Sequence, residues 1–197
     1  MKITEDLIIA SNNKHKVVEI KQILGDFFKN IYTLSDKNIN VEIEENGSTF
    51  EENALIKAKY ICELTGITTL SDDSGLEVEA LGGAPGVYSA RYAGELSDSN
   101  KNNQKLLAEM KNIQNRNANF TSVIAICYPD GKTITAKGAT YGKILTQAEG
   151  NNGFGYDPLF FSNDLQKSFG IATAQEKNAI SHRGRALQKM KEILSKQ

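Results

Sequence analysis

Two neighbouring aspartates, Asp72 and Asp73, stand between two serines directly after a short apolar run. Adjacent carboxylates on an extended backbone point in different directions, so one can face a ligand while the other holds the turn. A carboxylate pair with hydroxyls suits Mg²⁺, which takes few protein oxygens and keeps waters for phosphates. The alternative is an Asx turn with acidic surface residues. Further candidate acids are Glu42, Glu44 and Glu45, for which a solvated strand face or edge is the alternative.

A short polar segment follows the first apolar run and precedes a helical pattern. Helix N-termini present backbone N–H groups and the positive end of the helix dipole, so amides, a hydroxyl and lysines placed there predict a phosphate site. The segment lacks the GxxxxGK[ST] pattern of a Walker A loop, and an ordinary capped helix start with solvated lysines is the alternative. Its residues are Ser11, Asn12, Asn13, Lys14, His15 and Lys16.

Two glycines flank an aromatic residue in the segment from Asn151 to Pro158. Glycine lets the backbone approach a flat ligand, and an aromatic face can stack on a base. This indicates a base-binding loop, while a glycine-rich turn with core aromatics is the alternative. The residues of interest are Phe154, Gly155, Tyr156 and Asp157.

A cluster of donors begins at Lys177 and continues at the start of the last helix with His182 and Arg183. Arg183 lies four residues before Leu187, so it projects near the apolar stripe of this helix and needs a partner or a cavity. The cluster either points donors at a ligand or is structural, with Ser181 capping the helix and Arg183 paired with a carboxylate.

Strands and helices alternate along the chain, and at least one hairpin is present. Together these elements predict an α/β or α+β protein with a mixed sheet and flanking helices. Thr49 and Glu52 fit a capping box, and Gly66 fits a helix end. We expect strands at 6–10 and 67–70, helices at 14–25, 49–66, 98–113 and 181–196, and a hairpin of 120–128 with 133–142.

The composition is that of a globular protein: 40% of the 197 residues are hydrophobic, and the net charge is −1. A nearly neutral chain is a poor candidate for non-specific binding to nucleic acid or membranes. The longest apolar run, 123–128, is far shorter than the ~20 residues of a membrane span, and we find no signal-peptide pattern. Cys62 and Cys127 sit in apolar patterns typical of buried reduced thiols. A cytoplasmic protein is therefore expected.

Taken together, these segments resemble the Ham1/RdgB family of inosine triphosphate pyrophosphatases. The resemblance covers nearly the whole chain, and six motifs occur in the family's order. They are Ala10-Ser11-Asn12-Asn13 with Lys16, Thr49-Phe50-Glu51-Glu52-Asn53-Ala54 with Lys57-Ala58, Asp72-Asp73-Ser74-Gly75-Leu76, residues 81–92, Gly153-Phe154-Gly155-Tyr156-Asp157-Pro158, and Ser181-His182-Arg183-Gly184.

The resemblance implies one two-lobed domain over residues 1–197, an elongated mixed sheet with flanking helices and a central cleft. It also implies a cytoplasmic homodimer that uses Mg²⁺ to hydrolyse ITP, dITP and XTP to the monophosphate and pyrophosphate. Asp73 would be the catalytic residue, and Asp73 and Glu44 the metal ligands. The implied substrate-binding residues are Ser11, Asn12, Asn13, Lys14, His15, Lys16, Lys57, Ser74, Phe154, Gly155, Tyr156, Asp157, Lys177, His182 and Arg183.

Small departures from the family pattern occur at Asn12 and Asn152, where glycine is common, and at Asn46, where Thr or Ser is usual. Asn is the non-glycine residue that best tolerates a positive φ. Three other functions can be compared with these motifs. The Ser-His-Arg block argues against a Maf-type pyrophosphatase. A non-catalytic nucleotide sensor would not need Asp73 and the lysines. An RNA-binding module is disfavoured by the net charge and the absence of a basic aromatic sheet motif.

Overall fold

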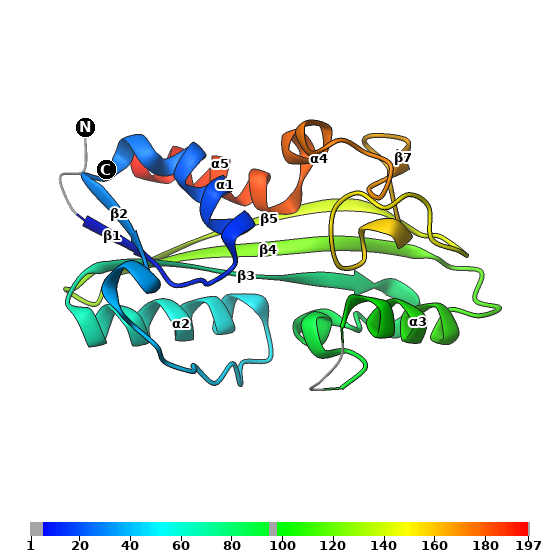
Figure 1. The fold of residues 1–197 in the computed structure, drawn as a ribbon, viewed down its shortest axis with the longest axis horizontal. Coiled ribbons are helices and arrows are strands. Elements are labelled where there is room, and N and C mark those ends of the chain that lie inside the picture. The colour runs from blue at the N-terminus through cyan, green and yellow to red at the C-terminus, as the bar shows by residue number, and fades with distance from the viewer. Residues whose placement is uncertain (1–5, 95–97, 197) are drawn as a thin grey trace. The chain divides into compact units, whose positions relative to one another are not determined.

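The computed structural model describes residues 6–94 and 98–196, and of His15 it describes the backbone alone. The strands form one mixed sheet in the order β2-β1-β3-β4-β5-β6-β7. β1 runs parallel to β2 and β3, whereas β5, β6 and β7 pair antiparallel. The predicted α/β class with a mixed sheet and flanking helices is confirmed (Figure 1).

The strands are β1 (Asp6–Ile9), β2 (Asn30–Thr33), β3 (Thr68–Val78), β4 (Asn117–Cys127), β5 (Thr133–Ile144), β6 (Phe160–Ser162) and β7 (Lys167–Ser168). The α-helices are α1 (Lys14–Leu24), α2 (Phe50–Thr65), α3 (Ser99–Glu109), α4 (Ala174–Ile180) and α5 (His182–Ser195). Short 3-10 helices lie at Gly25–Phe27, Ser35–Lys37, Glu79–Leu81, Gly86–Arg91 and Asp157–Leu159. None of the helices in the described ranges has the length and apolar content needed to cross a bilayer.

The chain divides into two compact units, and the divisions fall inside β3, β4 and β5. The first unit holds Met1–Asp73, Ser122–Gly138 and Arg183–Gln197, and the second holds Ser74–Thr121 and Ala139–His182. The predicted cleft between two lobes stays a prediction.

In the first unit, β1 is buried on both faces because helices cover both. Leu7 and Ile9 belong to a core cluster with residues of α1 and α5, whereas Ile8 belongs to another cluster with Ile61 of α2. This is the two-residue alternation of a strand, and Figure 1 shows α1 and α5 on one face with α2 on the other. Each fully buried Leu or Ile side chain contributes about 1.5–3 kcal/mol to folding.

Helix α2 has the predicted ends. The Thr49 side chain accepts a hydrogen bond from the Glu52 backbone N–H, and the Glu52 side chain accepts from the Thr49 backbone N–H. Gly66 ends the helix in the left-handed region at φ 65°. These end signals fix both limits of the helix that carries Lys57 to the sheet.

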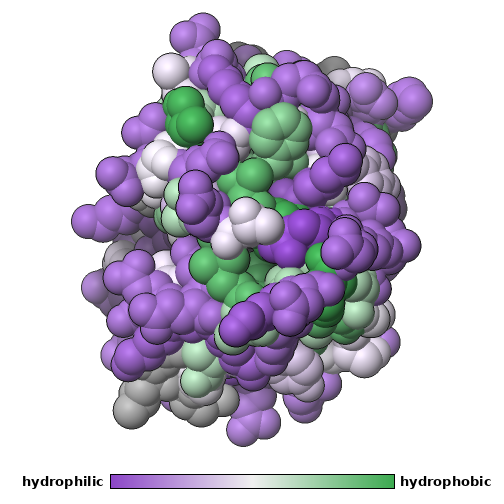
Figure 2. All heavy atoms as spheres, turned by 90° about the vertical axis from the view of Figure 1, so that its right-hand side faces the viewer, coloured by the Kyte–Doolittle hydropathy of each residue, from purple (hydrophilic) through white to green (hydrophobic). Residues whose placement is uncertain are grey.

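In the second unit, aromatic side chains form the centre of the core. The rings of Phe120 and Phe160 lie 4.8 Å apart between centroids, and those of Phe160 and Phe169 lie 5.0 Å apart. Leu106 of α3 and Met110 pack in the same cluster. Figure 2 shows a face on which apolar side chains gather in the middle and polar ones surround them.

Two sequence expectations differ from the structure. The strand expected to end after Leu70 continues to Val78, so Asp72 and Asp73 lie in the middle of β3 and form no turn. Side chains from the covering helices neutralise both carboxylates, which makes a buried, extended backbone tolerable here. In addition, a separate helix, α4, precedes α5, with a capping box of its own at Thr173 and Glu176.

The capping box of α2 gives a stability prediction. Replacing Thr49 with alanine removes the acceptor for the Glu52 N–H, so we expect the free energy of unfolding to fall by about 1 kcal/mol. Urea denaturation at neutral pH measures this change. Thr49→Ser is the matched control because it keeps the hydroxyl, and an equal loss in both variants would contradict the capping role.

Candidate functional site

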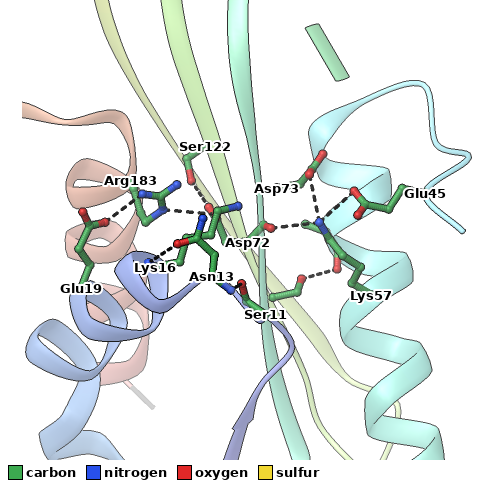
Figure 3. Close-up of polar contacts among 12 residues, drawn as sticks. Ser11, Asn13, Lys16, Glu19, Glu45, Lys57, Asp72, Asp73, Ser122 and Arg183 are labelled. Carbon is green, nitrogen blue, oxygen red and sulfur yellow. Dashed lines mark hydrogen bonds and ion pairs between the residues drawn. The ribbon is translucent and has the colours of Figure 1, made fainter. Parts of the chain in front are cut away.

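The two aspartates of β3 lie on opposite faces of the sheet, as neighbouring residues of a strand do. Asp72 faces α1 and α5, where Lys16 and Arg183 approach it, and Asp73 faces Lys57 of α2 (Figure 3). The expectation that the two carboxylates point in different directions is confirmed.

Asp72 is the most enclosed acidic group of this site. Its Oδ2 lies 2.6 Å from Lys16 Nζ and 3.3 Å from Arg183 Nε, and its Oδ1 accepts a hydrogen bond from Ser122 Oγ at 2.5 Å. Burial acts to raise the pKa of Asp72, but the charges of Lys16 and Arg183 outweigh it and hold the pKa well below its usual value. The carboxylate is therefore a fixed anion that holds two cationic side chains in place.

Asp73 is in a different environment. Its Oδ1 accepts a hydrogen bond from Lys57 Nζ at 3.0 Å. Its Oδ2 is buried and has no hydrogen-bond partner among the residues that the structure describes. Burial raises the pKa of Asp73 while Lys57 opposes this change. A buried carboxylate with one uncommitted oxygen can accept a proton or bind a cation.

Lys57 connects three parts of the first unit. Its Nζ donates to Asp73 Oδ1 at 3.0 Å, to the backbone oxygen of Asp72 at 3.1 Å and to Glu45 Oε2 at 3.0 Å. Burial acts to lower the pKa of Lys57, but Asp73 and Glu45 raise it above its usual value. The side chain is thus a buried cation beside the uncommitted oxygen of Asp73.

The polar segment before α1 adopts the capped helix start that was one of its two interpretations. Ser11 Oγ accepts from the Asn13 backbone N–H at 3.2 Å, and Asn13 Oδ1 accepts from the Lys16 backbone N–H at 3.3 Å. Asn12 and Lys14 are exposed. The side chain of His15 lies outside the described part of the chain. A capped helix start is compatible with phosphate binding. Lys16 lies in the first turn of the helix, where its pairing with Asp72 holds the ammonium group in place.

Arg183 has the carboxylate partners that its position near an apolar stripe required. Its Nη1 lies 3.1 Å from Glu19 Oε2 of α1, in addition to the contact with Asp72. Because α5 and α1 are joined through this side chain, Arg183 supports the first unit whether or not it also reaches a ligand.

The predicted base-binding residues of the second unit form a compact group. Asp157 accepts hydrogen bonds from the Phe154 backbone N–H at 2.7 Å and from Lys177 Nζ at 2.5 Å. Lys177 Nζ lies 4.5 Å from the centre of the Phe154 ring, which is 48% exposed. Tyr156 is buried and donates from its hydroxyl to the Ser89 carbonyl. An exposed aromatic ring with a fixed ammonium beside it can stack on a flat base and donate to it.

Two further predicted residues belong to the second unit. His182 is buried in the second unit, with its ring stacked 5.1 Å from that of Phe120. Ser74 is half-buried in β3, next to Asp73 in the chain.

The sequence alone did not predict the partners of three acidic residues, Glu45, Asp72 and Glu19. The structure places Glu45 on Lys57, whereas Glu44 is exposed, and its metal role stays a prediction. Asp72 and Glu19 hold Lys16 and Arg183. Glu19 lies one helical turn from Lys16, but no local pattern tells which distant cation an acidic side chain meets. These contacts depend on the tertiary structure.

The donor set around Asp73 fits a hard divalent cation. In the described residues, no group of three or more His, Cys, Asp or Glu side chains could hold a metal by itself. Mg²⁺ is commonly bound through one or two carboxylates, with waters and substrate phosphates as its other ligands. The uncommitted, buried Oδ2 of Asp73 fits that kind of site.

A groove of about 490 Å³ opens on the second unit. Its lining includes Glu77, Glu79, Asn119 and Tyr141, and none of the predicted site residues contributes to it. The candidate site is therefore identified by its buried charges and not by the volume of this groove.

Comparison with known proteins gives consistent matches. The chain matches the model of the Ham1 family over residues 7–193. It is 53% identical over 195 residues to a dITP/XTP pyrophosphatase of Clostridium perfringens, which covers 95% of this chain and 96% of that protein. It is 46% identical over 192 residues to a dITP/XTP pyrophosphatase of Desulforamulus reducens, with 96% of each chain covered.

Solved structures agree with these matches. The Ham1 protein of Staphylococcus aureus has a TM-score of 0.92 and 40% identity, with 98% of this chain and 99% of that chain covered. A HAM1 protein of Coxiella burnetii has a TM-score of 0.92 and 38% identity, with 98% and 100% covered. The mixed sheet with flanking helices is thus the fold of these proteins.

Asp72 gives a prediction for the pH dependence of stability. Because its folded-state pKa is below the ~3.9 of an unfolded aspartate, its stabilisation is present above about pH 4 and is lost as the pH falls through the folded-state pKa. Urea denaturation across acidic pH should show the unfolding free energy falling more steeply in the wild type than in Asp72→Asn. Parallel profiles would contradict the buried ion pairs.

Proposed function

This chain belongs to the Ham1 family, as its motifs predicted, and we propose that it hydrolyses ITP, dITP and XTP to the nucleoside monophosphate and pyrophosphate. The observation that carries the proposal is the buried Asp73 carboxylate, which has one oxygen on Lys57 and one uncommitted. The activity would remove deaminated purine nucleotides from the nucleotide pool. We further propose that the protein works in the cytoplasm as a homodimer.

Hydrolysis of a triphosphate requires a positioned water and neutralisation of charge on the phosphates. We assign charge neutralisation to Lys16 and Lys57, whose positions are fixed by Asp72 and Asp73. The proposed phosphate-binding segment, residues 11–16, would add backbone and amide donors. Asp73 would accept the proton of the attacking water, a role for which a raised carboxyl pKa is favourable.

We propose Asp73 and Glu44 as the residues that hold Mg²⁺. The bound ion would supply neutralising charge to the phosphates and lower the pKa of a coordinated water. Lys57 would keep Asp73 oriented by holding its Oδ1, which leaves Oδ2 for the ion or the water.

We assign the purine base to the group around Phe154. Its exposed ring would stack on the base, while Lys177, held by Asp157, would donate to an acceptor on the base edge. His182 and Arg183 would donate to the oxygen at position 6 of hypoxanthine or xanthine. Adenine carries an amino group there, and donors left unpaired at such a position can give rejection of about 10⁴-fold.

A substrate panel tests the proposed function. Pyrophosphate release from ITP, dITP, XTP, GTP and ATP would be measured with Mg²⁺ and with EDTA. We expect fast release from ITP, dITP and XTP with Mg²⁺, and slow release from GTP and ATP. Equal rates for all five nucleotides, or release of orthophosphate in place of pyrophosphate, would refute the proposal.

Asp73→Asn tests the catalytic assignment. The amide is nearly isosteric but cannot accept the proton of the water, so we expect kcat for ITP to fall by about 10²-fold or more. Steady-state pyrophosphate release measures this, and circular dichroism checks the fold. Turnover close to that of the wild type would remove Asp73 from the mechanism.

Arg183→Ala tests the selectivity assignment. We expect KM for ITP to rise and the ratio of kcat/KM for ITP over ATP to narrow by about tenfold, the effect of one lost specific contact. The change also removes a partner of Asp72 and Glu19, so thermal melts must accompany the kinetics. A lower Tm with an unchanged ITP/ATP ratio would leave Arg183 with a structural role only.

A further inference from the structure

The segment that leads from the acidic residues Glu44 and Glu45 into α2 is held by two side chains of that helix. Asn53 Oδ1 accepts a hydrogen bond from the Gly47 backbone N–H at 2.8 Å. Glu52 Oε2 accepts hydrogen bonds from the backbone N–H groups of Ser48 at 2.6 Å and of Thr49 at 3.2 Å, the two residues that follow Gly47. Three consecutive backbone donors are thus fixed to the first turn of α2.

Glu52 has a general reason to make its contacts, because it completes the capping box of the helix. Asn53 does not take part in the capping box. Its side chain is 1% exposed, and its Nδ2 has no hydrogen-bond partner among the described residues. A buried donor left unpaired destabilises the folded state. Folding stability alone therefore does not account for an asparagine at this position.

The backbone at Gly47 lies directly on the helix. A Cβ atom added there would lie 2.7 Å from Asn53 Oδ1 and 2.7 Å from Glu52 Cβ. Real Cβ atoms do not approach other atoms this closely, so a side chain would push the segment away from α2. The contact between Gly47 and Asn53 is consequently a close fit that either residue can break.

Asn53 and Lys57 lie one helical turn apart on α2 and share a face of the helix. Lys57 holds Glu45 and Asp73 at 3.0 Å each. The helix therefore holds the acidic segment at two points, Glu45 through Lys57 and Gly47 through Asn53. The second point fixes the backbone at Gly47, two residues after Glu45.

We propose that Asn53 is a positioning residue that sets the acidic segment Glu44–Glu45 beside Asp73 for binding the divalent cation. This inference rests on the proposed function, since it assigns Asn53 to the metal dependence of that activity. Asn53 itself touches neither substrate nor metal and acts through the Gly47 backbone.

The test measures metal binding directly, with Mn²⁺ alone as the probe. Free Mn²⁺ is followed by electron paramagnetic resonance in titrations of the full chain without nucleotide. We expect the Kd of Asn53→Ala to rise by about fivefold, the effect of one lost hydrogen bond. Gly47→Ala breaks the same contact from the other side and should raise the Kd similarly even if Asn53→Ala folds poorly. The Kd of the double variant should then be no higher than the Kd of the single variant that binds Mn²⁺ more weakly.

Asn30→Ala is the matched control, because it removes another asparagine hydrogen bond of 2.8 Å, to Asp6, within the same unit. Its Kd for Mn²⁺ should equal that of the wild type. In parallel, the Mg²⁺ concentration for half-maximal ITP hydrolysis should rise in both test variants, while KM for ITP at saturating Mg²⁺ stays within about twofold.

The outcomes separate the two proposals. If the wild type hydrolyses ITP and all variants bind Mn²⁺ equally, Asn53 has no positioning role and the proposed function stands. If Kd is unchanged but Tm falls in both test variants, the contact is structural only, which also overturns the inference. A wild type that does not hydrolyse ITP removes both proposals.

Discussion

The structure around the site depends on two adjacent carboxylates in the middle of a buried strand. Asp72 and Asp73 point to opposite faces of β3, and a charge on either face is costly unless a cation meets it. Each face is covered by helices, so each helix layer must bring its own cation. Lys16 and Arg183 meet Asp72 on one face, and Lys57 meets Asp73 on the other. The positions of α1, α2 and α5 on this part of the sheet are constrained by that requirement.

The two carboxylates differ in how many of their oxygens have a cation or a hydrogen-bond donor as partner, which supports separate roles for them. Asp72 has a cation or hydrogen-bond donor on both of its oxygens and serves to hold Lys16 and Arg183. Asp73 pairs with Lys57 and keeps one buried oxygen with no hydrogen-bond partner among the described residues. An arrangement built only for stability would satisfy both groups. The imbalance supports the proposed catalytic role of Asp73, while Asp72 keeps the surrounding charges fixed.

Several features governed by local rules were predicted from the sequence, although α4 was missed despite its own capping box, and contacts set by distant residues were not predicted. The capping box of Thr49, the end of α2 at Gly66 and the hairpin of β4 and β5 all depend on neighbouring residues, and all are confirmed. The prediction that the strand ends after Leu70 was wrong, because a polar run resembles a turn when the partners of its side chains are unknown. The motifs indicated Asp73 and Lys57 as site residues. They did not reveal the contacts of Asp72 or Glu45, because those contacts also depend on distant partners.

A crystal structure of the protein with Mg²⁺ and an ITP analogue that carries an imido group between the α- and β-phosphates is the most direct test of this division of roles. The account predicts the metal on Asp73, the phosphates near Lys16 and Lys57, and Asp72 still paired with Lys16 and Arg183. A metal bound to Asp72, or a nucleotide that contacts neither Asp73 nor Lys57, would contradict it.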